Sequence, residues 1–159
     1  MSGLDRFVRA QADPHAGFDA ALAELRSGRK RGHWIWYVFP QLAGLGSSRQ
    51  SQRYGLAGIE EAVEYLQHPV LGSRLVDATS AVVEAIRKGV PLQMLMGSTI
   101  DLMKLVSSLT LFEAVAARLY ERDGIEAHGS LVPLADDVLM AAFAEGHPRC
   151  QLTLARLRE

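Results

Sequence analysis

The sequence predicts an all-α protein, a single compact domain of about six to seven helices that spans residues 1–159 and includes a long loop containing glycine and serine. Three observations predict this class. Apolar residues recur at helical spacing along most of the chain. Each of these stretches begins and ends at residues that typically start or stop a helix. No internal repeat or long linker divides the 159 residues, and a chain of this length buries enough surface to form its own core.

Two helices are expected near the N-terminus. The first is short, and Ser2 is its expected N-cap. The second is expected to begin at Asp13-Pro14, because aspartate accepts hydrogen bonds from free backbone N–H groups and proline suits the first helical position. Gly28 is its expected stop. The inward-facing residues are Leu4, Phe7 and Val8 in the first helix and Phe18, Leu22 and Leu25 in the second. The basic residues Arg26, Arg29, Lys30 and Arg31 fit the cationic end of that helix.

The apolar periodicity of the rest of the chain predicts four more helices and a last short element around Leu152–Leu157. The third covers about residues 57–67 within the usual boundary tolerance, and His68-Pro69 ends it. The fourth begins near Val70 and ends at Gly89 and Pro91. The fifth runs from about residue 100 to 120, and the sixth starts at Pro133.

Two segments interrupt this regularity. Residues 33–39 (HWIWYVF) are apolar without a clear period, so they fit a buried strand or a buried helical turn equally well. Residues 41–55 (QLAGLGSSRQSQRYG) have the composition of a loop. Loops this long are uncommon in compact domains unless they are functional or flexible. This segment is therefore the first indication of a site.

Composition excludes several classes of protein. With 17 Lys+Arg against 18 Asp+Glu, the formal net charge is −1, which gives no electrostatic case for a nucleic-acid or membrane partner. The N-terminal residues show no apolar signal segment, and no apolar run is long enough to cross a bilayer. The lone Cys150 favours a reducing compartment, so we expect a cytoplasmic protein. The five histidines show no metal-ligand spacing, so no metal site is expected. No cofactor is expected either.

The aromatic segment and the loop supply candidate ligand-binding residues. His33, Trp34 and Trp36 fit either the floor of a pocket that stacks a flat ring or ordinary core packing. Glycines in GLGSS allow close backbone approach, but the segment lacks both the Walker ending and the strand that a dinucleotide fingerprint requires. An ordinary turn is the alternative. The candidate phosphate-binding groups of the loop are Ser47, Ser48, Arg49, Gln52 and Arg53.

The segment 101–112 (DLMKLVSSLTLF) is the most informative. At about 100° per residue, Asp101, Lys104 and Ser108 share one face of a helix that is otherwise strongly apolar. A buried helix needs specific partners for its few polar groups. These three residues therefore form either a structural network or part of a ligand site.

The sequence resembles a known family along nearly its whole length. The resemblance rests on GRKRGHWIW (28–36), FPQ (39–41) with Gly44 and Gly46, Ser51, Tyr54, EA (61–62) with YL (65–66), HPVLG (68–72) with RL (74–75), and DxxK (101–104) with SSxTLF (107–112). This is the uncharacterised, mainly bacterial family often mislabelled calpastatin, domain of unknown function 1810. The resemblance implies a mainly helical fold and brings no activity.

This chain departs from the family pattern at two positions. Cys150, Gln151 and Leu152 precede Thr153 where the family usually has an aspartate ahead of its final Thr-Leu, and Val106 stands where the family is often basic.

The order of features is also similar to that of the more distant NADAR group, which includes N-glycosidases that cleave base–ribose bonds in riboflavin intermediates or ADP-ribosyl adducts. Such chemistry requires a carboxyl group that protonates the leaving nitrogen and groups that stabilise the developing positive charge on the sugar. The resemblance implies Glu61 or Asp101 as the catalytic carboxyl. The ligand-binding candidates are His33, Trp34, Trp36, Gln41, Ser47, Ser48, Arg49, Arg53, Tyr54, Lys104 and Ser108.

Three functions follow as hypotheses. The first is an N-glycosidase-like hydrolase that acts on a nucleotide or ADP-ribose-type compound. The second is a non-catalytic binder of a nucleotide or phosphorylated small molecule, and the third is a protein-interaction helical module. The catalytic carboxyl separates the first two, because a hydrolase needs Glu61 or Asp101 open to a pocket and not held by a neighbouring cation.

Overall fold

Helices alone build the structure, a computed structural model that describes residues 3–159. The bounds are α1 Asp5–Gln11, α2 Phe18–Ser27, α3 Ile35–Val38, α4 Arg49–Tyr54, α5 Ile59–Gln67, α6 Leu71–Arg87, α7 Leu92–Met96, α8 Thr99–Asp123, α9 Glu126–Gly129, α10 Leu131–Ala144 and α11 Gln151–Leu157. Within the described range no strand forms, and an isolated parallel bridge joins Leu42 to Leu56. The all-α class is confirmed. Ser2, the expected first N-cap, lies outside the described residues.

The prediction of six to seven helices is too low, because four of the helices are very short. Helices α3, α4, α7 and α9 have 4, 6, 5 and 4 residues. Fewer than two helical turns cannot display a periodic apolar face. The ambiguous segment 33–39 therefore contains a helical turn, and the expected loop 41–55 contains α4.

The start of the second helix is also corrected. Helix α2 begins at Phe18, after the N-cap Gly17, and not at Asp13-Pro14. The Asp13 carboxylate instead accepts hydrogen bonds from the backbone N–H groups of His15 and Ala16, both at 2.8 Å. An aspartate that bonds the backbone two and three residues ahead closes a turn as readily as it starts a helix.

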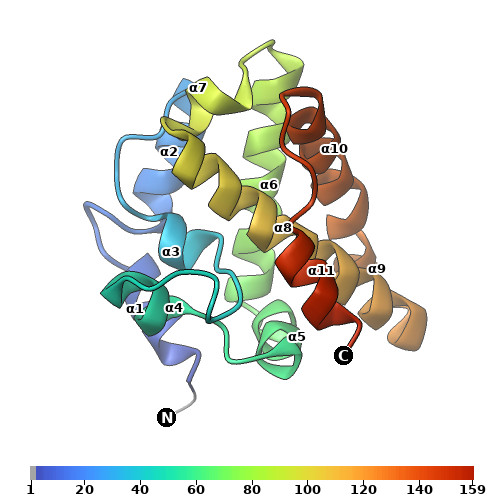
Figure 1. Cartoon of the computed structure of the whole chain (residues 1–159). Coiled ribbons are helices and arrows are strands. Elements are labelled where there is room, and N and C mark those ends of the chain that lie inside the picture. Colours follow the sequence, from blue (N-terminus) through green and yellow to red (C-terminus); the bar gives the residue numbers. More distant parts are fainter. Residues whose placement is uncertain (1–2) are drawn as a thin grey trace.

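The long helix α8 organises the packing. It has 25 residues and contacts α5, α7, α9, α10 and α11 (Figure 1). Its N-cap Ser98 accepts a hydrogen bond from the N–H of Asp101, and it ends at Gly124 in the left-handed conformation. Helix α6 packs against α2, α5 and α10. No helix within residues 3–159 is both long enough and apolar enough to cross a membrane.

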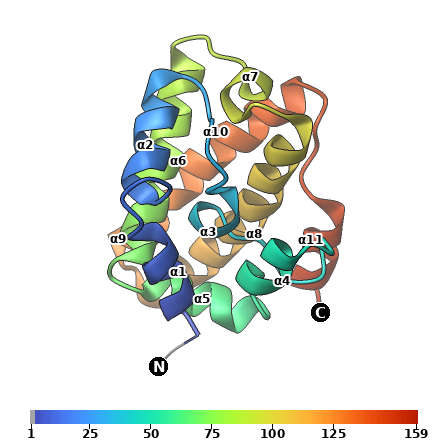
Figure 2. The ribbon, with the colours of Figure 1, turned by 90° about the vertical axis from the view of Figure 1, so that its left-hand side faces the viewer.

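Helices α1, α3 and α4 lie on one side of this packing, beside α5 (Figures 1 and 2). Aromatic rings in tilted and edge-to-face contact hold them in place. The Phe7 ring lies 5.2 Å from Tyr65 and 6.0 Å from Tyr54, and the Tyr37 ring lies 5.2 Å from Tyr54. Tyr65 in turn packs 5.3 Å from Phe112 on α8. The position of α4 is therefore set by rings from α1 and α3, which are themselves anchored to the core.

Candidate functional site

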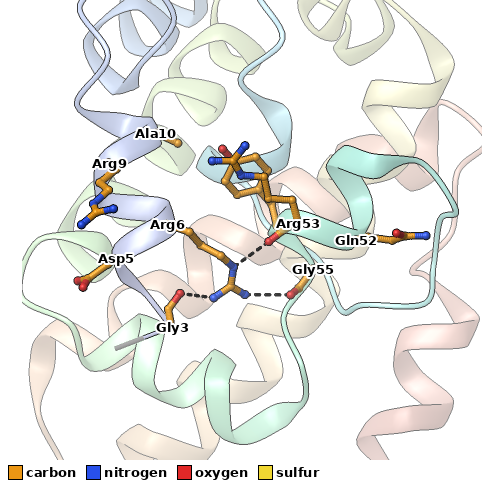
Figure 3. A pocket seen from close by; sticks show the side chains of 9 residues that line it. Gly3, Asp5, Arg6, Arg9, Ala10, Gln52, Arg53 and Gly55 are labelled. Atoms are coloured by element: carbon orange, nitrogen blue, oxygen red, sulfur yellow. Dashed lines mark hydrogen bonds between the residues drawn. The ribbon is translucent and has the colours of Figure 1, made fainter. Parts of the chain in front are cut away.

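Helix α4 separates two hollows, a wide pocket and a narrow cavity. The open pocket lies between α1 and α4 and has a volume of about 600 Å³ (Figure 3). It is lined by Gly3, Asp5, Arg6, Arg9, Ala10, Gln52, Arg53, Tyr54 and Gly55. This volume is within the usual range for small-molecule pockets. Three arginines against one aspartate give the pocket an excess of positive charge.

Arg6 connects α1 to the end of α4. Its Nε donates to the Arg53 carbonyl oxygen at 2.9 Å, and its Nη2 donates to the Gly55 carbonyl oxygen at 3.0 Å (Figure 3). It also donates to the Gly3 carbonyl oxygen. A Cβ at Gly55 would lie 2.6 Å from the Ser51 carbonyl oxygen and 2.8 Å from the Ala43 Cα, so only glycine fits this exit from α4. The Arg6 guanidinium thus serves as a structural tie.

Glu61 is held by the same guanidinium. Its Oε1 lies 2.7 Å from Arg6 Nη2 and also accepts a hydrogen bond from the Ala57 N–H at 3.2 Å. Burial opposes ionisation of this carboxyl, but the hydrogen bonds from Arg6 and Ala57 outweigh burial and hold the pKa of Glu61 below its ordinary value. Glu61 is therefore an ionised partner of Arg6.

Arg53, like Arg9, is an exposed cation of the open pocket. Its guanidinium carbon lies 5.4 Å from the centre of the Tyr54 ring. Within residues 3–159, no hydrogen bond or ion pair involves its side chain. Tyr54 itself is buried against Phe7 and Tyr37. The planar guanidinium of Arg53 thus packs against the buried Tyr54 ring, and its hydrogen-bond donors are available to a ligand.

The narrow cavity lies on the other side of α4. It has a volume of only about 10 Å³ and is lined by Ile35, Trp36, Phe39, Gln41, Ser51, Tyr54, Gly55 and Lys104. The Lys104 ammonium sits over the Trp36 ring, 3.7 Å from its centre. A volume of this size holds about one water molecule. In this arrangement the ammonium covers a face of the Trp36 ring that a flat ligand would need.

Asp101 lies between two lysines. Its Oδ2 is 2.8 Å from Lys30 Nζ, and its Oδ1 is 3.5 Å from Lys104 Nζ. The Lys30 side chain is only 4% exposed; it also donates to the Gly32 carbonyl oxygen and lies 5.1 Å from the centre of a Trp34 ring. A buried ammonium needs a close anion. Asp101 meets that need, and Lys30 is a core cation and not the surface end of a helix.

The remaining predicted residues lie elsewhere. Trp34 is fully buried, and its Nε1–H donates to the Glu24 carboxylate at 3.0 Å. Ser48 caps α4 by accepting a hydrogen bond from the Ser51 N–H at 3.1 Å. His33, Ser47 and Arg49 are exposed, and within residues 3–159 no hydrogen bond or ion pair joins them to Asp101 or Lys104. Ser108 is fully buried, and its hydroxyl has no hydrogen-bond partner within that range.

The structure therefore divides the predicted site. Trp36, Gln41, Tyr54 and Lys104 meet at the narrow cavity, and Arg53 lines the open pocket together with Tyr54. Sequence reasoning missed Arg6 and Arg9, because no local pattern indicates that a cation on α1 faces a helix more than 40 residues later. Among the described residues, no group of three or more His, Cys, Asp or Glu side chains is arranged to hold a metal ion.

The fold and the site together define an all-α domain with a surface pocket lined by arginines. The model of the family described as "Protein of unknown function (DUF1810)" matches residues 1–125. The crystal structure of the conserved hypothetical protein Rv1873 from Mycobacterium tuberculosis is similar, with 40% sequence identity and a TM-score of 0.72. The alignment covers 96% of this chain and 94% of that one. The chain belongs to the DUF1810 family. None of the curated proteins matches the sequence.

Proposed function

We propose that the protein binds a phosphorylated small molecule of the nucleotide type in the open pocket between α1 and α4, and that it does so without cleaving the ligand. The observation that carries this proposal is the charge of the pocket. Arg6, Arg9 and Arg53 line it, and because Glu61 offsets the charge of Arg6, two arginines remain against the single carboxylate of Asp5. Guanidinium groups bind phosphate in a bidentate manner, so an excess of them in one pocket favours an anionic ligand.

Arg53 is the residue best suited to contact the phosphate. Its side chain is exposed and, within the described range, engages no carboxylate, so ligand binding breaks no ion pair. The Tyr54 ring beneath it limits its motion, which reduces the entropy lost on binding. The exposed face of a guanidinium also stacks on a flat base. Arg53 thus offers a phosphate contact and a stacking surface at one place.

The contacts of the two carboxylates favour binding over hydrolysis. An N-glycosidase needs a carboxyl group that donates or accepts a proton near the sugar. Glu61 is paired with Arg6, which lowers its pKa, and Asp101 is paired with Lys30 and Lys104. Release of either carboxyl would leave a partly buried cation without its partner. The N-glycosidase hypothesis stays a prediction that turnover assays can decide.

Isothermal titration with ADP-ribose, adenosine and inorganic phosphate tests the proposal. We expect ADP-ribose to bind and adenosine, which lacks phosphate, to bind at least tenfold more weakly. Arg53→Ala should weaken ADP-ribose binding at least about tenfold, because a charge-assisted hydrogen bond contributes roughly 1.5–3 kcal/mol. Arg49→Ala is the matched control, since Arg49 is also exposed on α4 but does not line the pocket.

Three outcomes would contradict the proposal in different ways. Equal binding of ADP-ribose and adenosine would exclude phosphate recognition. Equal loss in the Arg49 and Arg53 variants would exclude the assigned pocket. Chromatography of incubations with NAD, ADP-ribose or riboflavin-pathway intermediates detects any free base or ribose phosphate that is released. Such release would show that the protein is a hydrolase and not a non-catalytic binder.

A further inference from the structure

Another hollow, which we call the α5–α8 groove, lies where α5 packs against the C-terminal half of α8 (Figure 1). It has a volume of about 220 Å³. Its lining residues are Ile59, Val63, Val115, Arg118, Leu119 and Arg122. None of them lines the open pocket between α1 and α4, so the groove is a separate surface with its own chemistry.

The floor of the groove is apolar. Val115 and Leu119 are one turn apart on α8 and are only 1% and 2% exposed. Ile59 and Val63 are one turn apart on α5, pack against the core and stay partly exposed. Apolar surface therefore remains in contact with water inside the hollow, and covering such surface is favourable.

Two arginines border this floor. Arg118 and Arg122 are one turn apart on α8, and both are exposed. Arg118 Nη2 donates to the Leu157 carbonyl oxygen of α11 at 3.0 Å, a neutral partner that leaves the positive charge in place. Among residues 3–159, no carboxylate forms an ion pair with either guanidinium. Like charges at this spacing on a helix repel each other, so an anion between them would be favourable.

The neighbouring carboxylate of Asp123 is engaged elsewhere. Its Oδ1 accepts a hydrogen bond from the Ile125 N–H at 2.8 Å, and its Oδ2 lies 2.9 Å from His128 Nδ1. The C-terminal end of a helix attracts cations, which accounts for the charge of Arg122 in the last turn of α8. It does not account for the apolar hollow beside that charge.

We propose that the α5–α8 groove binds a medium-chain aliphatic carboxylate. The alkyl chain lies on the apolar floor, and the carboxylate binds between Arg118 and Arg122. Small-molecule sites typically combine a mainly apolar lining with a few charged groups, and guanidinium groups bind carboxylates through paired hydrogen bonds.

The size and the lining of the groove define the class of ligand. One water molecule takes up about 30 Å³ in the liquid, so the hollow accommodates roughly seven groups of that size, which favours a chain of about six to eight carbons. The aliphatic floor offers no hydrogen-bond partner to a sugar or a base. This ligand therefore differs in class from the one proposed for the open pocket.

Isothermal titration of the full chain with octanoate, butanoate and octanol tests the proposal. We expect octanoate to bind and butanoate, which has four fewer methylene groups, to bind at least about tenfold more weakly. Octanol keeps the chain but lacks the charge, and Arg122→Ala removes one guanidinium; we expect each change to weaken binding at least about tenfold. Arg87→Ala is the matched control, because Arg87 is also an exposed arginine in the last turn of a long helix but lies outside the groove.

Nitrogen–proton NMR spectra locate the site, since octanoate should shift the amide signals of the lining residues. Val63→Thr keeps the shape of the side chain but makes the floor more polar, so it should weaken octanoate binding roughly threefold. Thermal melting shows whether each variant retains its fold. ADP-ribose should not compete with octanoate, which separates this site from the open pocket.

The proposal is overturned if octanoate does not bind, if octanol binds as tightly as octanoate, or if the two arginine variants lose affinity equally. Signals that shift only outside the groove would also overturn it. The same holds if an acidic amphipathic peptide shifts the groove signals and octanoate does not, because the groove would then be a protein-docking surface.

Discussion

At the scale of single residues, the Glu24 carboxylate holds the turn between α2 and α3 together. Its Oε1 accepts hydrogen bonds from the N–H groups of Arg31 at 2.6 Å and Gly32 at 2.8 Å, and from the indole N–H of Trp34 at 3.0 Å. Burial opposes its ionisation, but these hydrogen bonds hold the pKa of Glu24 below its ordinary value. One carboxylate therefore shapes the turn that places Trp34 in the core.

We predict that Glu24→Ala lowers the free energy of unfolding by about 2–4 kcal/mol, because it leaves the buried Trp34 N–H and two backbone donors without their acceptor. Glu24→Gln should lose less, since its amide oxygen still accepts. Urea denaturation followed by tryptophan fluorescence measures both changes. An alanine variant within 0.5 kcal/mol of the wild type would show that solvent replaces the carboxylate without loss.

At the scale of elements, the corner between α5 and α6 requires a glycine. His68 Nδ1 accepts hydrogen bonds from the N–H groups of Val70 at 3.1 Å and Leu71 at 3.2 Å, which satisfies the first free donors of α6. A Cβ at Gly72 would lie 2.2 Å from the Leu66 carbonyl oxygen. The close approach of the two helices therefore depends on the absence of a side chain at Gly72.

We predict that Gly72→Ala lowers the free energy of unfolding by about 1–3 kcal/mol, because the added methyl group pushes the start of α6 away from the backbone at Leu66 in α5. Gly58→Ala is the control, since a Cβ there meets nothing within 4 Å and the φ of −179° suits any residue. We expect it to change stability by less than about 0.5 kcal/mol. Thermal melting of both variants compares them, and equal shifts would contradict the steric argument.

At the scale of the whole molecule, the ionised carboxylates contribute to stability. Backbone hydrogen bonds from His15 and Ile125 lower the pKa values of Asp13 and Asp123, and hydrogen bonds also lower those of Glu24 and Glu61. Burial raises the pKa of Glu113 despite its pairing with Arg149. Because four carboxyl pKa values are lowered and one is raised, acidification should destabilise the folded protein.

We predict that the free energy of unfolding is nearly constant around neutral pH and falls below about pH 4.5, the ordinary glutamate value. A carboxyl whose pKa is lower in the folded state stabilises the fold above its unfolded pKa, and this contribution disappears as the pH falls through the folded pKa. Urea titrations between pH 7 and pH 3 measure the dependence. Glu61→Gln should make the acid limb shallower, and stability that rises toward pH 3 would contradict the prediction.

The sequence predicted the long helices well because each has enough turns to show its apolar face. On α8, the predicted apolar face contains Leu105, Leu109 and Phe112, and all three side chains are fully buried in the core. It could not predict α4, because Arg49–Tyr54 is too short for a periodic face and is held by rings from α1 and α3. The small helices were missed for the same reason.

The sequence by itself determined the helical class, the boundaries of α6 and α8 within a few residues, and the polar row of Asp101 and Lys104, because these depend on local periodicity. Only the tertiary structure decided that Lys30 is buried against Asp101, that Arg6 holds Glu61, and that Arg53 lines an open pocket. Those contacts join residues 47 to 71 positions apart, and their geometry depends on how the helices pack.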